Sequence, residues 1–237
     1  MNPDARPQKK HRRLSGVEIL FEDRDLIVIH KEPGLLTNSP HRDEPRTAER
    51  LLTSYLRKGN ARSRLRAYTV HRLDRDTSGL LVFAKSERVQ QQLKNSWRDV
   101  DKTYYAVVHG HLERPSGRIV NYLAENKEQF VYATTDPAAG KKAETRYREA
   151  ARSGQCTALH VDLLTGRKNQ IRVHLADLGH PIVGDPKYGK KGDRFRRMAL
   201  HAMHLEFDHP FSHRRMIFDD PVPPELLGLT APKRADQ

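Results

Sequence analysis

The sequence has little of what secreted and membrane-spanning proteins rely on. Its 237 residues include one cysteine, Cys156, which excludes an internal disulfide and a cysteine-based metal site and suits a reducing compartment. No segment approaches the roughly 18 consecutive apolar residues that a membrane helix needs, and the polar N-terminus has no apolar signal segment. We therefore expect a soluble protein that stays in the cytoplasm.

Acidic residues are too few to balance the basic ones. The chain has 43 Lys and Arg residues against 30 Asp and Glu, which gives a formal net charge of +13 and a pI near 10.0. Positive charge of this size attracts polyanions, and its binding to nucleic acid depends on salt and is blind to base sequence. We expect a nucleic acid as the partner, with a merely basic enzyme as the alternative.

Apolar patterning predicts an α+β protein with one large domain, or with two lobes that share a sheet. Residues 1–15 are basic and too polar for a core, so we expect a disordered arm there, a domain over 16–228 and a polar tail over 229–237. Helices are expected at 48–57, after Ser86 and at 169–178, and strands at 17–21, 26–29, 80–84, 103–108, 130–134, 144–150, 156–164, 200–207 and 215–218. Trp97 is expected on the buried face of the second helix, with Val89 and Leu93.

The most informative segment is HRLDRDTSG at residues 71–79, which is followed by the apolar run LLVFA. Five apolar residues in a row predict a buried strand, so the polar residues before them belong to a loop that is supported by the core. Such loops often carry functional groups. The residue types alone leave open a second interpretation, in which Asp74 forms a surface ion pair with Arg72 or Arg75.

Four segments of the chain resemble, in order, the motifs of the RluA-type RNA pseudouridine synthases. The resemblance runs from about Val17 to Pro224. The segments are HRLDRDTSGLL at 71–81, KTYYAVVHG at 102–110, TGRKNQIRVHL at 165–175 with GHPIVGDPKYG at 179–189, and LHA at 200–202 with FDHP at 207–210. One match to a motif this long is specific, and four in family order leave little room for accident.

The resemblance implies the fold, the reaction and the catalytic carboxylate. The implied fold is an α+β domain with a mixed, mainly antiparallel bent sheet, flanking helices and a central catalytic cleft. The implied reaction turns a uridine in RNA into pseudouridine, so that N1 leaves C1′ and C5 joins it, without metal or cofactor. Asp74 is the implied catalytic residue, and it can attack C1′, stabilise positive charge there or remove a neighbouring ribose proton. The sequence does not choose among these routes.

The same motif match implies two further catalytic residues. Arg172 is expected to pair with Asp74 and offset its desolvation in a pocket that excludes water. Tyr104 is expected to lie against the flipped uracil, where its ring can stack and its hydroxyl can serve a late proton transfer at C5. The expected substrate-binding residues are Arg72, which would fill the space left by the base or hold a phosphate, Arg167, and Ile171 and Leu200 as apolar walls of the uracil pocket.

Two segments depart from the family pattern, and we expect neither to touch one of the three catalytic residues. Lys168-Asn169 stands where the family has a Thr-His pair, and HKEPG at 30–34 replaces Asn-Lys-Pro-x-Gly. Only about 16 residues precede the first expected strand, so we expect no small N-terminal RNA-binding domain of the kind that many relatives carry. We expect the arm and two basic loops, at 57–66 and 187–197, to select the target. We expect a monomer that acts on RNA, with ribosomal RNA slightly preferred over transfer RNA.

Two other functions agree with parts of the sequence. A metal hydrolase would use some of the 13 histidines, such as His201 and His204, but the sequence has no HExxH motif and no cysteine cluster. A non-catalytic RNA-binding protein of the same fold would explain the charge, but it would not require Asp74, Tyr104 and Arg172 in their motifs.

Overall fold

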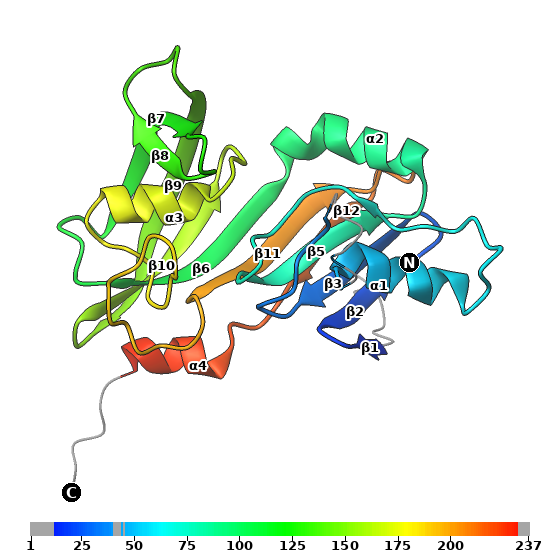
Figure 1. Ribbon diagram of the computed structural model, residues 1–237, viewed down its shortest axis with the longest axis horizontal. Helices are drawn as coiled ribbons and strands as arrows, with labels where there is room; N and C mark the ends of the chain where they lie inside the picture. The colour runs from blue at the N-terminus through cyan, green and yellow to red at the C-terminus, as the bar shows by residue number, and fades with distance from the viewer. Residues whose placement is uncertain (1–11, 40–43, 45, 232–237) are drawn as a thin grey trace, which may run out of the picture. The chain divides into compact units, whose positions relative to one another are not determined.

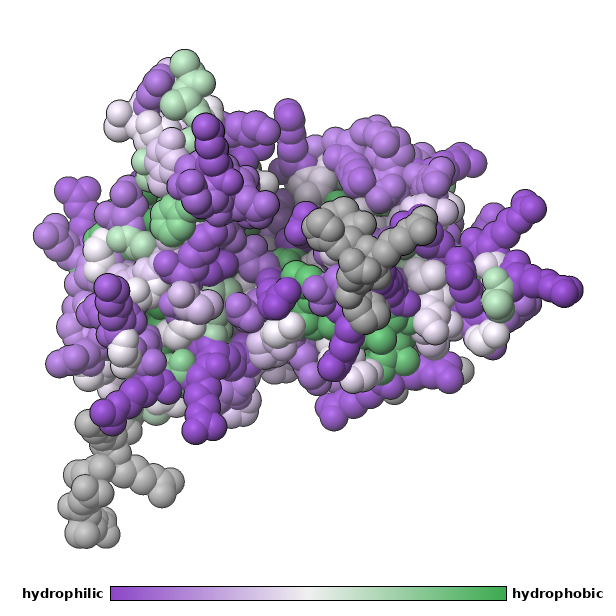
Figure 2. Space-filling view, in the orientation of Figure 1, coloured by the Kyte–Doolittle hydropathy of each residue, from purple (hydrophilic) through white to green (hydrophobic). Residues whose placement is uncertain are grey.

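The structure is a computed structural model, and it describes residues 12–39, 44 and 46–231. Most of the predicted N-terminal arm and C-terminal tail lies outside these residues. Figure 2 shows hydrophilic residues over most of one face, with hydrophobic residues in small groups, in agreement with the charged composition. Among the described residues, no helix combines the length and the apolar content that crossing a bilayer requires.

Two compact units make up the chain. The first holds the described residues up to Trp97 together with Asp208–Arg214, and the second holds Arg98–Phe207 together with the described residues from Arg215 onward. Each unit contains antiparallel strands and helices (Figure 1), so the predicted α+β class is confirmed. The predicted central cleft would involve both units and stays a prediction.

The first unit carries the HRLDRDTSG loop on a buried strand. Its elements are β1 (Arg12–Leu14), β2 (Val17–Glu22), β3 (Leu26–Lys31), α1 (Ala48–Arg57), β4 (Tyr68–Thr69), β5 (Ser78–Ala84) and α2 (Glu87–Ser96), and the 3-10 turn η1 (Trp97–Asp99) begins at its end. The strands pair in the order β1-β2-β3-β5, and β4 pairs with the end of β5. Every residue of β5 is buried, as the apolar run predicted.

Both helices of the first unit begin after the N-cap residues that the sequence indicated. The Thr47 hydroxyl accepts a hydrogen bond from the Arg50 amide, and the Ser86 hydroxyl accepts one from the Val89 amide, each at 3.3 Å. These bonds satisfy amides that have no partner within the helix. Leu52 and Leu56 form the buried side of α1, and α2 contacts β4 and β5.

Two predictions for the first unit are wrong in detail. Arg12–Leu14, expected in the disordered arm, form β1 by pairing with β2, because a short edge strand can form from polar residues once a neighbouring strand supplies the hydrogen bonds. Trp97 is only half-buried and lies outside α2, which ends at Ser96. Its ring stacks on His71 instead, with centroids 4.5 Å apart.

The second unit is built on the long strand that contains Tyr104. Its elements are β6 (Asp101–His109), β7 (Ser116–Glu125), β8 (Val131–Thr134), β9 (Lys141–Ser153), β10 (Cys156–Leu163), α3 (Gln170–Asp177), β11 (Leu200–Asp208), β12 (Arg215–Asp219), α4 (Pro224–Leu227) and η2 (Gly228–Thr230). The strands follow the order β11-β6-β10-β9-β7-β8, and β12 pairs with β11. Helix α3 lies across β8 and β9 in Figure 1, and it contacts both strands.

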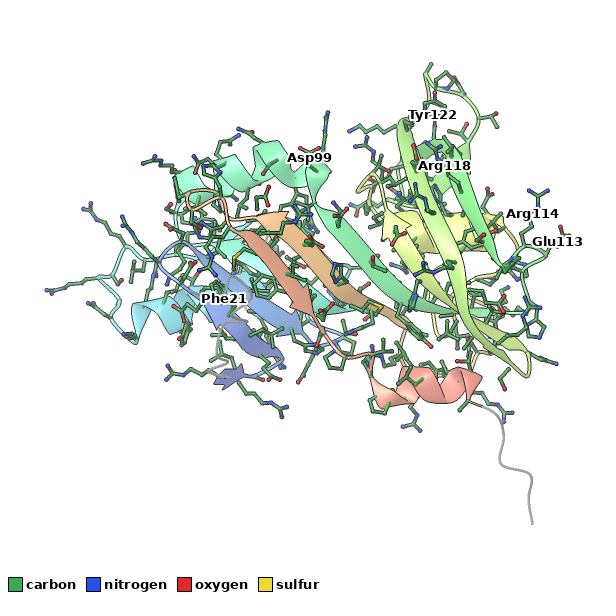
Figure 3. All side chains as sticks on the ribbon, turned by 180° about the vertical axis from the view of Figure 1, so that it is seen from behind. Phe21, Asp99, Glu113, Arg114, Arg118 and Tyr122 are labelled. Atoms are coloured by element: carbon green, nitrogen blue, oxygen red, sulfur yellow. The ribbon has the colours of Figure 1, made fainter. Side chains whose placement is uncertain are left out.

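Sequence patterning missed strand β7 and the C-terminal elements. Strand β7 has mostly exposed or half-buried side chains, such as Arg118 and Tyr122 in Figure 3, so its apolar alternation is weak. Gly117 of β7 has no side chain to add to the pattern. A Cβ at this position would lie only 2.6 Å from the Tyr147 hydroxyl. Thr230 in η2 is buried, so the fold continues past 228 into the predicted tail.

Candidate active site

Asp74 lies in the loop between β4 and β5 of the first unit. The residue is half-buried, whereas Arg72, two positions earlier, is exposed. The Thr77 amide donates to the Asp74 carbonyl at 3.2 Å, which closes a turn immediately before β5. The loop therefore leads directly into a buried strand, as the sequence indicated.

Thr37 holds the peptide before Asp74. Its hydroxyl donates to the Leu73 carbonyl at 2.9 Å and accepts from the Leu73 amide at 3.1 Å. Thr37 and Leu73 are both buried, so water does not compete for these bonds. One hydroxyl thus fixes both polar backbone groups of the residue that precedes the carboxylate.

Lys31 holds the backbone one residue after Asp74. Its ammonium, in a side chain with no exposed surface, donates to the carbonyls of Glu32, Leu35 and Arg75 at 2.8–2.9 Å. An ammonium has three donors, and here all three are used. The Gly34 amide also donates to the Arg75 carbonyl, at 2.9 Å. The end of β3 and the turn after it therefore clamp the Asp74 loop.

His71 supports the start of the same loop. Its Nε2 accepts a hydrogen bond from the Val82 amide of β5 at 3.1 Å, so the proton of the neutral ring lies on Nδ1. The ring stacks on Trp97 with an interplanar angle of 25°. The loop is thus attached to β5 by a side chain as well as by the backbone.

In the second unit, Tyr104 and Leu200 lie on one face of the sheet. Tyr104 of β6 is paired with Ala202 of β11, and Leu200, two residues before Ala202, is paired with Ala106. Directly paired residues share a face, so Leu200 is a diagonal neighbour of Tyr104. Tyr105 lies on the opposite face, where its ring meets His160 edge to face. The predicted site residues on β6, β11 and α3 are all buried, namely Tyr104, Leu200 and Ile171.

Arg172 is held in the second unit by the carboxylate of Asp185. Nε donates to Oδ2 and Nη2 donates to Oδ1, each at 2.8 Å, with side-chain exposures of 8% and 0%. Burial alone would raise the pKa of Asp185, but the Arg172 guanidinium and the amides of Tyr188 and Lys187 hold that pKa below its usual value. Removing one member of such a buried pair strands the other charge, at a cost of about 3–5 kcal/mol.

Asn169 and Tyr188 complete the support of Arg172. Asn169 has a left-handed backbone (φ 55°) and precedes α3, and its Oδ1 accepts from Nη1 of Arg172 at 3.2 Å. The guanidinium carbon lies 5.1 Å from the centre of the Tyr188 ring, whose hydroxyl accepts from Asn169 Nδ2 at 3.2 Å. The departure from the family pattern at Lys168-Asn169 therefore does reach a predicted catalytic side chain, contrary to our expectation.

Gln170 and His174 attach α3 to the sheet. Gln170 Oε1 accepts from the Thr165 hydroxyl and the Arg167 amide, and its Nε2 donates to the Glu144 carbonyl and the Thr145 hydroxyl. His174 contacts Thr145 and Asn121 at 2.8 Å each, and burial lowers its pKa to about 4. The ring is therefore neutral near pH 7. Neither side chain was predicted as a catalytic or substrate-binding residue, although both lie inside the third motif.

The predicted site residues are divided between the two units. Asp74 and Arg72 belong to the first unit, and the others belong to the second. Arg167 is exposed, and its Nε donates to the Lys142 carbonyl at 3.0 Å. The predicted ion pair between Asp74 and Arg172 joins residues of different units and stays a prediction.

His209, Asp23 and Asp25 form a cluster in the first unit whose ligand atoms lie within 4.8 Å of one another. His209 Nδ1 accepts from the amides of Phe211 and Ser212, so Nε2 carries the proton and donates to Asp23 Oδ2 at 3.1 Å. Asp23 Oδ1 accepts from the amides of Asp25 and Leu26. These bonds attach the segment 208–214 to the turn between β2 and β3, and a metal ion at Nε2 would have to displace that proton.

Comparisons with known proteins agree with one another. The chain matches the RNA pseudouridylate synthase family over residues 25–177. It is 34% identical to the uncharacterized RNA pseudouridine synthase YjbO of Bacillus subtilis over 217 residues, which are 90% of this chain and 75% of that protein. It is 35% identical to ribosomal large subunit pseudouridine synthase D of Escherichia coli, over 93% of this chain and 71% of that protein.

A solved structure has a similar fold. The human RNA pseudouridylate synthase domain containing 1 superposes with a TM-score of 0.70 at 26% identity, which covers 89% of this chain and 86% of that one. The Asp74 loop and α3 both lie inside the residues that match the family. The chain therefore belongs to the RNA pseudouridylate synthase family, in its RluA-type branch, and is an isomerase that acts on RNA.

Proposed function

We propose that Asp74 is the catalytic carboxylate of this synthase and that its target uridine lies in ribosomal RNA. The observation that carries the proposal is the support of the Asp74 loop, because Thr37 binds the backbone of Leu73 and Lys31 binds that of Arg75, the residues on either side of Asp74. A group that must meet one ribose carbon needs such fixed geometry.

The reaction needs a carboxylate near the sugar. The N1–C1′ bond of the uridine breaks, the C5–C1′ bond forms, C5 loses its proton and N1 gains one, so no atom is gained or lost overall. Positive character develops at C1′ as the first bond breaks, and an anion beside it lowers that barrier. Attack on C1′, charge stabilisation and removal of a ribose proton all start from Asp74 in its ionised form.

Arg172 and Tyr104 are the partners of Asp74 in this proposal. A guanidinium has five N–H donors, so an arginine held by Asp185 can also contact a second carboxylate. Tyr104 would stack on the uracil and serve the proton transfer at C5. Arg72 and Arg167 would contact the RNA backbone or fill the place of the base, and Ile171 and Leu200 would form apolar walls of the uracil pocket.

The choice of ribosomal RNA is supported by a relative. The Escherichia coli protein that is 35% identical to this chain carries the name ribosomal large subunit pseudouridine synthase D. The proposal includes a monomeric enzyme that works in the cytoplasm, where a single cysteine stays reduced. Pseudouridines mapped in RNA from cells without the protein would test it: loss from ribosomal RNA is expected, and loss from transfer RNA alone would contradict the choice.

The test of Asp74 is the isosteric variant Asp74→Asn. We expect it to abolish the release of tritium from RNA labelled at C5 of uridine while RNA binding stays near that of the wild type, because charge is lost and shape is kept. The control is Asp76→Asn, which removes one negative charge from the same loop and should leave tritium release unchanged. Activity that survived Asp74→Asn would refute the assignment, and a wild type that bound RNA without releasing tritium would point to a non-catalytic RNA-binding protein.

A further inference from the structure

The loop between β7 and β8 ends in an exposed aromatic residue. Phe130 keeps 38% of its surface exposed, although it precedes the buried Val131. Its ring contacts Tyr188 of the 179–189 segment, with centroids 4.9 Å apart and an interplanar angle of 49°. Part of the Phe130 ring is thus buried against Tyr188 and the remainder faces solvent.

Hydrogen bonds fix this loop in one conformation. Asn126 Oδ1 accepts from the Phe130 amide at 2.8 Å, and the Asn126 amide donates to the Phe130 carbonyl at 2.9 Å. Gln129 adopts a left-handed backbone (φ 59°), and its amide donates to the Asn126 carbonyl at 3.0 Å. The exposed ring is therefore held in position before any partner binds.

A cation lies against the same ring. Lys187 Nζ is 5.1 Å from the centre of the Phe130 ring and 5.6 Å from that of Tyr188. The ammonium is held there by a hydrogen bond of 2.9 Å to the Gln129 carbonyl. A fixed π surface beside a fixed positive charge matches the two parts of a nucleotide, its base and its phosphate. We call Phe130, Lys187 and Tyr188 the Phe130 platform.

The platform is connected to Arg172 through Tyr188. The Tyr188 ring contacts the Arg172 guanidinium as well as Phe130, and the Tyr188 hydroxyl accepts from the Val131 amide at 3.2 Å. Asp185, which binds Arg172, also accepts at Oδ1 from the amides of Lys187 and Tyr188. The exposed ring therefore belongs to the same rigid assembly as the predicted catalytic arginine.

We infer that the Phe130 platform binds one unpaired nucleotide of the substrate RNA, with the base stacked on Phe130 and the phosphate near Lys187. The inference rests on the proposed function and adds a second contact to it, distinct from the pocket for the target uridine. RNA is favoured over a protein partner because the chain carries a net charge of +13 and the platform pairs an aromatic ring with a cation. Stacking is tolerant of base identity, so the platform would recognise an unpaired base rather than a sequence.

The test compares Phe130→Leu with Phe130→Trp. Leucine keeps an apolar contact with Tyr188 but has no π face, whereas tryptophan keeps the face. The probe is a fluorescein-labelled single-stranded RNA of uridines that contains one 5-iodouridine. We expect Phe130→Leu to weaken binding about 5- to 150-fold, the equivalent of ~1–3 kcal/mol for one stacked base, and Phe130→Trp to bind like the wild type. Photocrosslinking should attach the iodouridine to the peptide that contains Phe130.

Phe211 provides a matched control. Its exposure is 36%, and Arg88 lies over its ring at 4.9 Å, so it has the same kind of environment in the first unit. Phe211→Leu should bind the RNA like the wild type. Lys187→Met should weaken binding. It should also reduce the slope of the logarithm of the binding constant against the logarithm of salt concentration by about one. Equal losses for Phe211→Leu and Phe130→Leu would refute a specific platform.

The outcomes separate this inference from the proposed function. If the wild type releases tritium from labelled RNA and Phe130→Leu has unchanged RNA affinity and no change in crosslinking, the platform is refuted and the proposed function stands. If the wild type crosslinks at Phe130 but Asp74→Asn keeps its activity, the catalytic assignment is refuted and the platform stands. A change of oligomeric state in Phe130→Leu with unchanged RNA affinity would identify a protein interface and overturn the inference.

Discussion

Thr37→Val is the sharpest test of how the Asp74 loop is held. Valine has nearly the shape of threonine, so the variant removes one hydroxyl without opening a cavity. Two bonds are lost together, since the hydroxyl donates to the Leu73 carbonyl and accepts from the Leu73 amide. Thr37 is 1% and Leu73 is 5% exposed, so water does not readily replace the hydroxyl.

The magnitude follows from the stranded groups. A buried polar group that loses its partner costs about 1–3 kcal/mol, and partial relaxation of the loop recovers some of this, so we expect the free energy of unfolding to fall by about 2–4 kcal/mol. Because Asp74 follows Leu73 directly, freeing that peptide should lower kcat by about tenfold or more with little change in KM. The control is Thr37→Ser, which keeps the hydroxyl and should lose only the ~0.8 kcal/mol of a buried methyl group.

Urea denaturation gives the first quantity, and tritium release from RNA labelled at C5 of uridine gives the second. Three results would refute the reasoning. A Thr37→Val protein as stable as the wild type would mean that the Leu73 peptide finds other partners. Normal kcat in a destabilised variant would mean that the loop is positioned without Thr37. Losses in Thr37→Ser as large as those in Thr37→Val would mean that the site tolerates no change in packing, and the hydroxyl would then not be the cause.

Two further predictions concern buried titratable groups. Lys31→Met removes the ammonium from the carbonyls of Glu32, Leu35 and Arg75, of which Arg75 keeps a second donor, the Gly34 amide. We therefore expect the free energy of unfolding in urea to fall by about 3–5 kcal/mol and tritium release to fall with it, and wild-type stability would contradict the clamp. Burial lowers the pKa of His174 from its usual value of 6.5 to about 4, so the unfolded state binds the proton first and stability is lost as pH falls through this window. Between about pH 7.5 and pH 5 the wild type should lose ~2 kcal/mol more than His174→Gln in urea denaturation, and equal losses would show that the ring is not held neutral.

The sequence predicted those elements whose residues carry strong local signals. Helix α1 has an N-cap residue and an apolar face, and its observed range, 48–57, is the range that the sequence predicted. Strand β5 follows from five apolar residues. Strand β7 and strand β1 have mostly exposed or half-buried side chains, and they exist because a neighbouring strand supplies their hydrogen bonds. Such pairing is a property of the tertiary structure and leaves little periodicity in the sequence.

The candidate site was predicted where its motif is contiguous and missed where its support comes from elsewhere in the chain. The position of Asp74 before a buried strand could be predicted, whereas Thr37 and Lys31 lie about 40 residues earlier. One signal was available for Lys31, because the segment HKEPG keeps the lysine of the family pattern Asn-Lys-Pro-x-Gly. No local signal marks Asp185 as the partner of Arg172, since the side chains are 13 residues apart and meet only after α3 and the following loop have folded.

The Asp185 pair changes the electrostatic role that Arg172 can have toward Asp74. The pair formed by a guanidinium and a buried carboxylate has almost no net charge. The field of the pair at a second carboxylate is therefore weaker than the field of an isolated cation. Arg172 would then act mainly through directed hydrogen bonds, which depend on its position, and Asp185, Asn169 and Tyr188 fix that position. The Asp74 loop has a second buried cation on its own side of the chain, because the Lys31 ammonium donates to the carbonyl of Arg75, the residue after Asp74. Lys31, which occupies the lysine position of the family pattern Asn-Lys-Pro-x-Gly, thus holds the Asp74 loop by directed hydrogen bonds, as Asp185 holds Arg172.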